Sequence, residues 1–196
     1  MSARVIPLHR FDDYLVTSQS ASEERFWGRA LRRAFPDAWA IGPNRGNNHA
    51  QRCGTDWLVA LPNNTTRRIE CKLRRKPYAE YPDVLLEYVA NDSNGTPGWI
   101  ELPLQCDELF YGWSCGRVMR FDFVRLQTAW LRHKTEWLGH MVAGERHGFR
   151  KSVANNGRYR TLGCVVPINE LFKSLRHDLD FVVDNDDHDN ADEVSP

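Results

Sequence analysis

Residues 55–73 read TDWLVALPNNTTRRIECKL, and this pattern predicts a β-hairpin. Two segments rich in strand-forming residues, 57–61 and 67–73, flank a turn sequence at 62–66. The turn contains a proline, which fixes one backbone dihedral, and two asparagines, which accept conformations that most residues avoid. We therefore expect two antiparallel strands joined by a short polar loop.

The hairpin separates polar from apolar side chains, because side chains alternate between the two faces of a strand. Glu70 and Lys72 share one face, and the odd-numbered residues of 69–73 form an apolar face that can be buried. If the hairpin closes symmetrically about Asn64, Asp56 lies opposite Lys72 and diagonal to Glu70. Opposite residues have Cβ atoms roughly 5 Å apart, and diagonal ones about 7–8 Å. This spacing leaves room for a divalent cation held by both carboxylates.

Charged side chains on a strand of this kind need a partner or a metal ion, because burial of an unpaired charge is costly. The sequence allows two interpretations. In the first, Asp56 and Lys72 form a cross-strand pair on a surface hairpin. In the second, Asp56 and Glu70 bind a hard cation beside Lys72, and we favour this interpretation because of the motifs that lie C-terminal to the hairpin.

Asp56, Glu70 and Lys72, in the form Asp-x13-Glu-Cys-Lys, resemble the core motif of the PD-(D/E)XK nuclease superfamily. Further along, a predicted strand at 84–88 and a Gly-rich loop ending in Gly-Trp-Ile at 98–100 are similar to small nucleases and resolvases of phage and plasmid type. The segment 155–171, with its Asn-x3-Tyr-x-Thr and Val-Pro-Ile motifs, is similar to the end of such proteins. The resemblance covers roughly residues 20–175. One departure is Thr55, which stands where the family name has a proline.

The resemblance implies a restriction-endonuclease-like core of α/β (α+β) class, a small mixed β-sheet flanked by helices. It implies Mg²⁺-dependent cleavage of DNA, with Mn²⁺ as a substitute. Asp56, Glu70 and the carbonyl of Cys71 would hold the metal, because Mg²⁺ prefers oxygen ligands. Lys72 would orient the attacking water or stabilise developing charge. The branched DNA of recombination junctions is one substrate that such enzymes cut, and junction resolvases are usually symmetric homodimers.

A first helix is predicted to begin near Ser22, as an N-cap, with acidic residues in its first turn and an apolar stripe that ends at Phe35. Related nucleases often place a glutamate on a first helix near the metal. Glu24, or its neighbour Glu23, is the candidate here, and ordinary helix N-terminal charge is the alternative. Glu87 lies on the next predicted strand, and the sequence leaves open whether it faces the site.

Hydrophobic periodicity predicts the later elements. Residues 104–115 are read as a helix that turns into a strand, and 117–123 as a strand or the approach to a helix. Residues 124–142 form a helix whose apolar face includes Leu131. A strand at 162–166 and a short helix from 168 to 175 complete the domain.

The charge distribution favours a polyanionic partner. The chain of 196 residues has 26 basic and 26 acidic residues, but eight of the acids lie in 177–196, where Lys and Arg are absent. Residues 1–176 therefore hold 26 basic and 18 acidic residues, a net charge of +8. A basic domain at 1–176 favours DNA as the partner. The tail at 177–196, which we expect to be disordered, either aids solubility or mimics DNA in competition for the basic surface.

Cationic residues surround the proposed site in sequence. The loop before Asp56 and the residues after Lys72 are rich in Arg and Lys, and a second basic cluster lies near 146–160. Such residues suit phosphate contacts, although a charged edge strand that resists aggregation is the alternative for those after Lys72. The predicted DNA-binding residues are Arg45, Arg52, Arg67, Arg74, Arg75, Lys76, Arg150, Lys151 and Arg158.

Cysteine usage and hydropathy indicate a cytoplasmic protein. The five cysteines are odd in number and form no Cys-x2-Cys pair, which argues against a disulfide framework and a zinc ribbon. The sequence contains no apolar segment long enough to span a membrane, and its N-terminus lacks the apolar core of a signal peptide. Three alternatives to an autonomous nuclease remain: a non-catalytic DNA-binding protein on the same fold, a nuclease subunit that works only with a partner, and an acidic-tailed inhibitor of nucleic-acid proteins.

Overall fold

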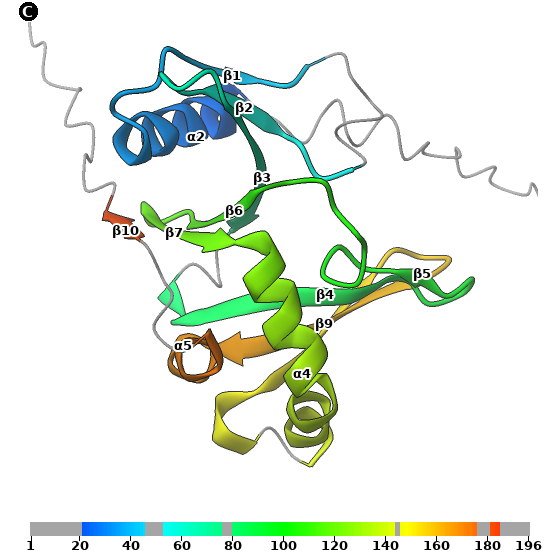
Figure 1. Cartoon of the computed structure of the whole chain (residues 1–196). Coiled ribbons are helices and arrows are strands. Elements are labelled where there is room, and N and C mark those ends of the chain that lie inside the picture. The colour runs from blue at the N-terminus through cyan, green and yellow to red at the C-terminus, as the bar shows by residue number, and fades with distance from the viewer. Residues whose placement is uncertain (1–20, 46–52, 76–79, 144–145, 176–180, 185–196) are drawn as a thin grey trace, which may run out of the picture.

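A computed structural model describes residues 21–45, 53–75, 80–143, 146–175 and 181–184 (Figure 1). Its strands form a six-stranded sheet, in the order β1-β2-β3-β6-β7-β10, and a four-stranded sheet, in the order β5-β4-β9-β8. The larger sheet contains β1 (Ala40–Pro43), β2 (Trp57–Ala60), β3 (Thr66–Arg74), β6 (Glu108–Trp113), β7 (Arg117–Asp122) and β10 (Phe181–Asp184). The smaller contains β4 (Asp83–Asn91), β5 (Thr96–Pro97), β8 (Arg150–Asn155) and β9 (Arg160–Pro167). The helices of the described residues are α2 (Ala21–Ala34), α4 (Phe123–Val142), α5 (Ile168–Leu175) and a 3₁₀ turn, η2 (Arg146–Gly148).

The larger sheet is mixed. Strands β1, β2 and β3 form an antiparallel meander, and β6 then pairs with β3 in parallel. Between β3 and β6 the chain leaves this sheet to build β4 and β5 of the smaller one. Strand β7 returns antiparallel to β6, and β10 extends the sheet beyond β7. The mixed α+β class predicted from the sequence is therefore confirmed.

Helix α2 covers one face of the larger sheet, at the top of the view in Figure 1. Its apolar stripe buries Trp27 and Leu31, which pack against Trp57 and Ile69 of the hairpin. Burial of such side chains contributes about 1.5–3 kcal/mol each. The apolar face of β3 is thus covered as predicted. The helix begins at Ala21, so Ser22 lies within its first turn and the predicted N-cap position is wrong.

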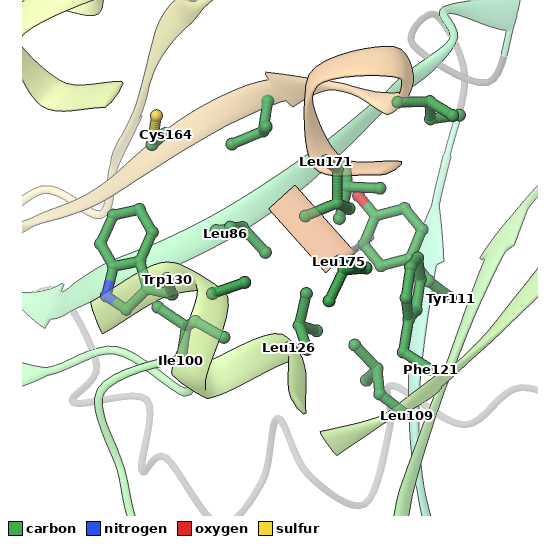
Figure 2. Packing of buried hydrophobic residues seen from close by; sticks show 14 of the residues in the cluster. Leu86, Ile100, Leu109, Tyr111, Phe121, Leu126, Trp130, Cys164, Leu171 and Leu175 are labelled. Atoms are coloured by element: carbon green, nitrogen blue, oxygen red, sulfur yellow. The ribbon is translucent and has the colours of Figure 1, made fainter. Parts of the chain in front are cut away.

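The opposite face of the larger sheet meets the smaller sheet and helices α4 and α5. Figure 2 shows Leu109 and Tyr111 of β6 packed in one cluster with Leu86 of β4, Trp130 of α4 and Leu171 of α5. This second core holds the two sheets together. It matters for the site because Glu70 and Lys72 lie on the same face of the sheet as their β6 partners, Leu109 and Tyr111.

Several predicted elements differ in the structure. Residues 104–115 contain no helix: an irregular segment leads directly into β6, whose side chains are all buried. Leu131 lies on the outer face of α4, with 61% of its surface exposed, and is not part of the apolar face. Residues 181–184, which the sequence assigns to the acidic tail, form β10.

In the part of the chain that the structure describes, no helix is both long and apolar enough to cross a membrane. All five cysteines are free thiols. Cys106 and Cys164 are buried, Cys53 and Cys71 are partly buried, and Cys115 is exposed.

Candidate metal and catalytic site

The hairpin turn fixes how the two carboxylates meet. The strands pair Trp57 with Ile69 and Ala60 with Thr66, so the next pair along the ladder sets Asp56 opposite Glu70. The symmetric closure predicted from the sequence, with Asp56 opposite Lys72, is wrong by two residues.

The cause is a three-residue loop at 62–64, in which Asn64 has a left-handed φ of 58°. The amide N–H of Leu61 donates to the carbonyl of Thr65 at 2.9 Å and closes the loop. The side chain of Asn63 accepts hydrogen bonds from the backbone and hydroxyl of Thr65 at 3.2 and 2.6 Å. Because the register shift is an even number of residues, every side chain keeps its predicted face.

Backbone hydrogen bonds to two different segments hold Asp56 in place. Its N–H donates to the carbonyl of Ile69 at 2.8 Å, and its carbonyl accepts the N–H of Asn44 at 2.8 Å. The preceding Gly54 has a left-handed φ of 83°. A Cβ there would approach the side chain of Leu104 to 2.9 Å, so this turn requires glycine. The Asp56 carboxylate is thereby directed along β3, where Oδ2 accepts the N–H of Cys71 at 2.9 Å.

Glu70 is buried, with 4% of its surface exposed. Its Oε1 forms an ion pair with Nζ of Lys72, and its Oε2 has no hydrogen-bond partner. A buried carboxylate oxygen without a partner is unusual, because its lost hydration is not replaced. The Glu70 carboxylate interacts with that of Asp56, and the two together mark a place where a cation would be bound favourably.

The electrostatics of the site agree with this geometry. Burial and the neighbouring Asp56 carboxylate raise the pKa of Glu70 to about 7, against the lowering effect of Lys72. Burial alone would lower the pKa of Lys72, but the carboxylates of Glu70, Asp56 and Glu87 outweigh it and raise that pKa. Without a cation, the site carries more negative charge than the single ammonium group neutralises.

Glu87 of the smaller sheet acts electrostatically on Lys72, which bears on the question that the sequence leaves open. Its interaction with Lys72 crosses between the two sheets. Burial raises the pKa of Glu87, while Lys72 and a hydrogen bond from the backbone N–H of Trp99 lower it. The sequence could not settle the orientation of Glu87, because β3 and β4 belong to different sheets. The only local signal is the alternation that places Asp83 and Glu87 on one side of β4.

The first helix contributes no carboxylate to this group. Glu24 forms an ion pair with Arg45, and Glu23 forms one with Arg75. Across the described ranges, no three or more His, Cys, Asp or Glu side chains are grouped closely enough to hold a metal ion. The prediction that Glu24 is a metal ligand is therefore not supported. A cation at the site would have Asp56 and Glu70 as its carboxylate ligands, and its other ligands would be backbone oxygen or water.

The predicted DNA-binding residues that the structure describes fall into three groups. Arg74 and Arg150 are engaged by the buried carboxylate of Asp83, so their predicted phosphate contacts are not supported. Exposed members with an acidic partner are Arg45 with Glu24, Arg75 with Glu23, and Arg67, whose Nε lies 4.0 Å from Oε1 of Glu108. Lys151 and Arg158 are exposed on β8 and the turn after it. Arg52 and Lys76 lie outside the described residues.

A separate surface hollow of about 320 Å³ lies between α4 and α5. Its lining is polar and includes none of the residues of the proposed site. It is lined by Arg132, His133, Glu136, Trp137, Glu170, Lys173 and Ser174.

Comparison with known proteins finds no family model that matches the chain, no similar curated protein and no matching solved structure. The function of the chain is therefore inferred from its own side chains.

Proposed function

We propose that this protein is a Mg²⁺-dependent DNA nuclease of the PD-(D/E)XK type, which hydrolyses phosphodiester bonds. The observation that carries the proposal is the buried, unpartnered Oε2 of Glu70 beside Asp56 and Lys72. Oxygen donors at this position fit Mg²⁺, and Mn²⁺ as a substitute, better than a softer metal.

Asp56 and Glu70 would hold the cation, together with the backbone carbonyl of Cys71. A bound Mg²⁺ lowers the pKa of its water and stabilises charge on the phosphate oxygens. Lys72 has a raised pKa, so its Nζ keeps its proton and can face the charge that develops on the phosphate. The hairpin keeps these groups at fixed positions, because Asp56 is bound through its backbone N–H and carbonyl to neighbouring segments.

Topology supports a restriction-endonuclease-like core within the larger sheet. A helix, α2, precedes the β1-β2-β3 meander, and β6 then joins in parallel beside β3. The proposed site lies on β3, one of the two central strands of the sheet, and at the residue that precedes β2. Strands β4 and β5 of the smaller sheet are inserted between β3 and β6, and β4 carries Glu87.

DNA is the proposed substrate because the part of the chain before the acidic tail is basic. Exposed Lys151 and Arg158, and the solvent-facing side chains of Arg45, Arg67 and Arg75, would supply phosphate contacts. If branched junctions are the substrate, two sites in a symmetric homodimer would cut opposite strands. Such an enzyme would act in the cytoplasm.

The test is cleavage of end-labelled linear, nicked, flapped and four-way DNA with Mg²⁺, with Mn²⁺ and with EDTA. We expect cleavage with either metal and none with EDTA. Asp56→Ala, Glu70→Ala and Lys72→Ala are each expected to reduce the rate at least 100-fold while the circular dichroism spectrum stays native. Glu136→Gln is the matched control, since this exposed carboxylate lies on α4 and pairs with His133 and His140. Full activity in any one of the alanine variants removes that residue from the proposed set.

A non-catalytic or partner-dependent DNA-binding protein is the second candidate. It is favoured by the ion pair that Lys72 makes with Glu70 and by the missing third side-chain ligand among the described residues. Binding of these DNAs without cleavage, under both metals, would decide for this candidate.

A further inference from the structure

We propose that Glu87 is a positioning residue that takes over the ammonium group of Lys72 when a divalent cation occupies Glu70. This inference rests on the proposed function, because it requires a cation between Asp56 and Glu70. It assigns the smaller sheet a role in the site: it supplies the second of two positions between which Lys72 moves.

The packing of the two sheets brings Glu87 to Lys72. Strand β4 crosses the face of β3 and β6 that carries the site. At one end, Nη2 of Arg74 donates to Oδ1 of Asp83 at 3.3 Å. Further along, the hydroxyl of Tyr111 accepts the N–H of Leu85 at 2.9 Å.

These contacts define the order of residues along the crossing. Tyr111 is the partner of Lys72 in the parallel β3–β6 ladder. Because side chains alternate along a strand, Asp83, Leu85 and Glu87 lie on the same side of β4. The direction from Arg74 to Lys72 along β3 therefore corresponds to the direction from Asp83 to Glu87 along β4.

Glu87 is fixed by the loop that follows β5. The backbone N–H of Trp99 donates to its carboxylate, and the N–H of Ile100 donates to its carbonyl at 3.3 Å. A Cβ on Gly98 would lie 2.2 Å from the Glu87 carbonyl oxygen, so only glycine allows the loop to approach this closely. A carboxylate held in this way is a prepared position for a cationic partner.

Lys72 needs a second partner because a cation bound to Glu70 would carry the same sign of charge as its ammonium group. In the structure, Lys72 forms an ion pair with Oε1 of Glu70, while Oε2 of the same carboxylate has no partner. Like charges a few ångströms apart repel each other strongly at the effective dielectric of a protein site. A divalent cation on Glu70 would therefore repel the ammonium group of Lys72.

Glu87 can relieve the repulsion between the cation and the ammonium group of Lys72. Three carboxylates, Asp56, Glu70 and Glu87, and one ammonium group leave two negative charges, which a divalent cation neutralises. Attraction between Glu87 and Lys72 already acts across the sheets, since Glu87 is one of the carboxylates that favour the charged form of Lys72. In the cation-bound site, Lys72 would leave Glu70 and pair with Glu87.

The test measures Mn²⁺ binding by titration calorimetry, without DNA, in four proteins: wild type, Glu87→Gln, Lys72→Met and the double variant. We expect Glu87→Gln to weaken Mn²⁺ binding about tenfold, because Lys72 then continues to compete for Glu70. With Lys72 replaced by methionine, the same Glu87 change should alter the affinity by less than twofold. Glu87→Asp should recover much of the loss in the presence of Lys72.

Two results overturn the inference while leaving the cation site intact. An equal loss of affinity with and without Lys72 would make Glu87 a direct ligand. Unchanged affinity in Glu87→Gln would leave it with no role towards the cation. Wild-type protein that binds no Mn²⁺ would refute both the cation site and the inference, and Mn²⁺ binding without DNA cleavage would refute the nuclease proposal alone. Native thermal unfolding in each variant, with Glu136→Gln as the control, ensures that folded proteins are compared.

Discussion

At the scale of single residues, Glu70 is the group on which the site depends. It is buried, it has one cationic neighbour in Lys72, and the nearby Asp56 carboxylate opposes its ionisation. Such a carboxyl group is stable either as a neutral acid or as an anion bound to a further cation. The folded protein therefore has to prefer one of these two states, and pH and divalent metal select between them.

This preference predicts how stability depends on pH in EDTA. The pKa of Glu70 is about 7 in the folded protein, above its ordinary value of 4.5. The folded state thus binds a proton more tightly than the unfolded state, and its contribution is lost as the pH rises from 4.5 to 7. One pKa unit corresponds to about 1.4 kcal/mol, so the loss is of order 3 kcal/mol. Lys72 adds no slope in this window, because its pKa is raised from an already high value.

Urea unfolding at pH 5, 6 and 7 measures this effect. Glu70→Gln should remove most of the pH dependence, since the amide cannot ionise, and Mg²⁺ should restore stability to the wild type at pH 7. A wild type whose stability rises over this window in EDTA would contradict the raised pKa of Glu70.

At the scale of elements, the hairpin shows what sequence can and cannot predict. The alternation of side chains between the two faces of a strand predicted the correct faces for Glu70 and the apolar residues of β3, because this alternation is a local property of the chain. The register was wrong, because it depends on the backbone conformation of one loop residue, Asn64. The approach of β4 to Lys72 was beyond local reasoning, since it results from how two sheets pack. The helix predicted within 104–115 failed for the same reason, because burial between the two cores favours a strand there.

The role of Asn64 in the register can be tested with two substitutions. A non-glycine residue in the left-handed region costs roughly 1–2 kcal/mol, and a β-branched side chain is tolerated worst. Asn64→Val should therefore lower the free energy of unfolding by at least this amount, and Asn64→Gly should leave it nearly unchanged. Denaturant unfolding of both variants gives the comparison. Equal stability of the valine and glycine variants would show that the loop conformation does not determine the pairing of Asp56 with Glu70.

At the scale of the whole molecule, the site lies where two sheets meet, so its geometry depends on how firmly they are joined. Apolar packing joins them, as Figure 2 shows for Leu86, Leu109 and Trp130. Asp83 adds a polar connection, because its buried carboxylate binds Arg74 of the larger sheet and Arg150 of the smaller one. This connection lies at the end of the β3–β4 crossing that is further from Glu87. Arg74 and Arg150, which the sequence suggested for DNA binding, thus join the two sheets through Asp83.

Removal of that carboxylate should destabilise the protein and loosen the site together. Asp83→Ala leaves two guanidinium groups without their shared anion, one of them buried, and loss of one partner from a buried ion pair costs about 3–5 kcal/mol. Asp92→Ala is the control, since its pair with Arg160 is exposed and a much smaller loss is expected. Thermal unfolding measures the first effect, and Mn²⁺ affinity at a temperature where Asp83→Ala is folded measures the second. Because the crossing of β4 over β3 sets the position of Glu87, Mn²⁺ binding should weaken in Asp83→Ala and stay unchanged in Asp92→Ala. Stability and Mn²⁺ affinity that are both unaffected in Asp83→Ala would show that the apolar core alone fixes the sheets.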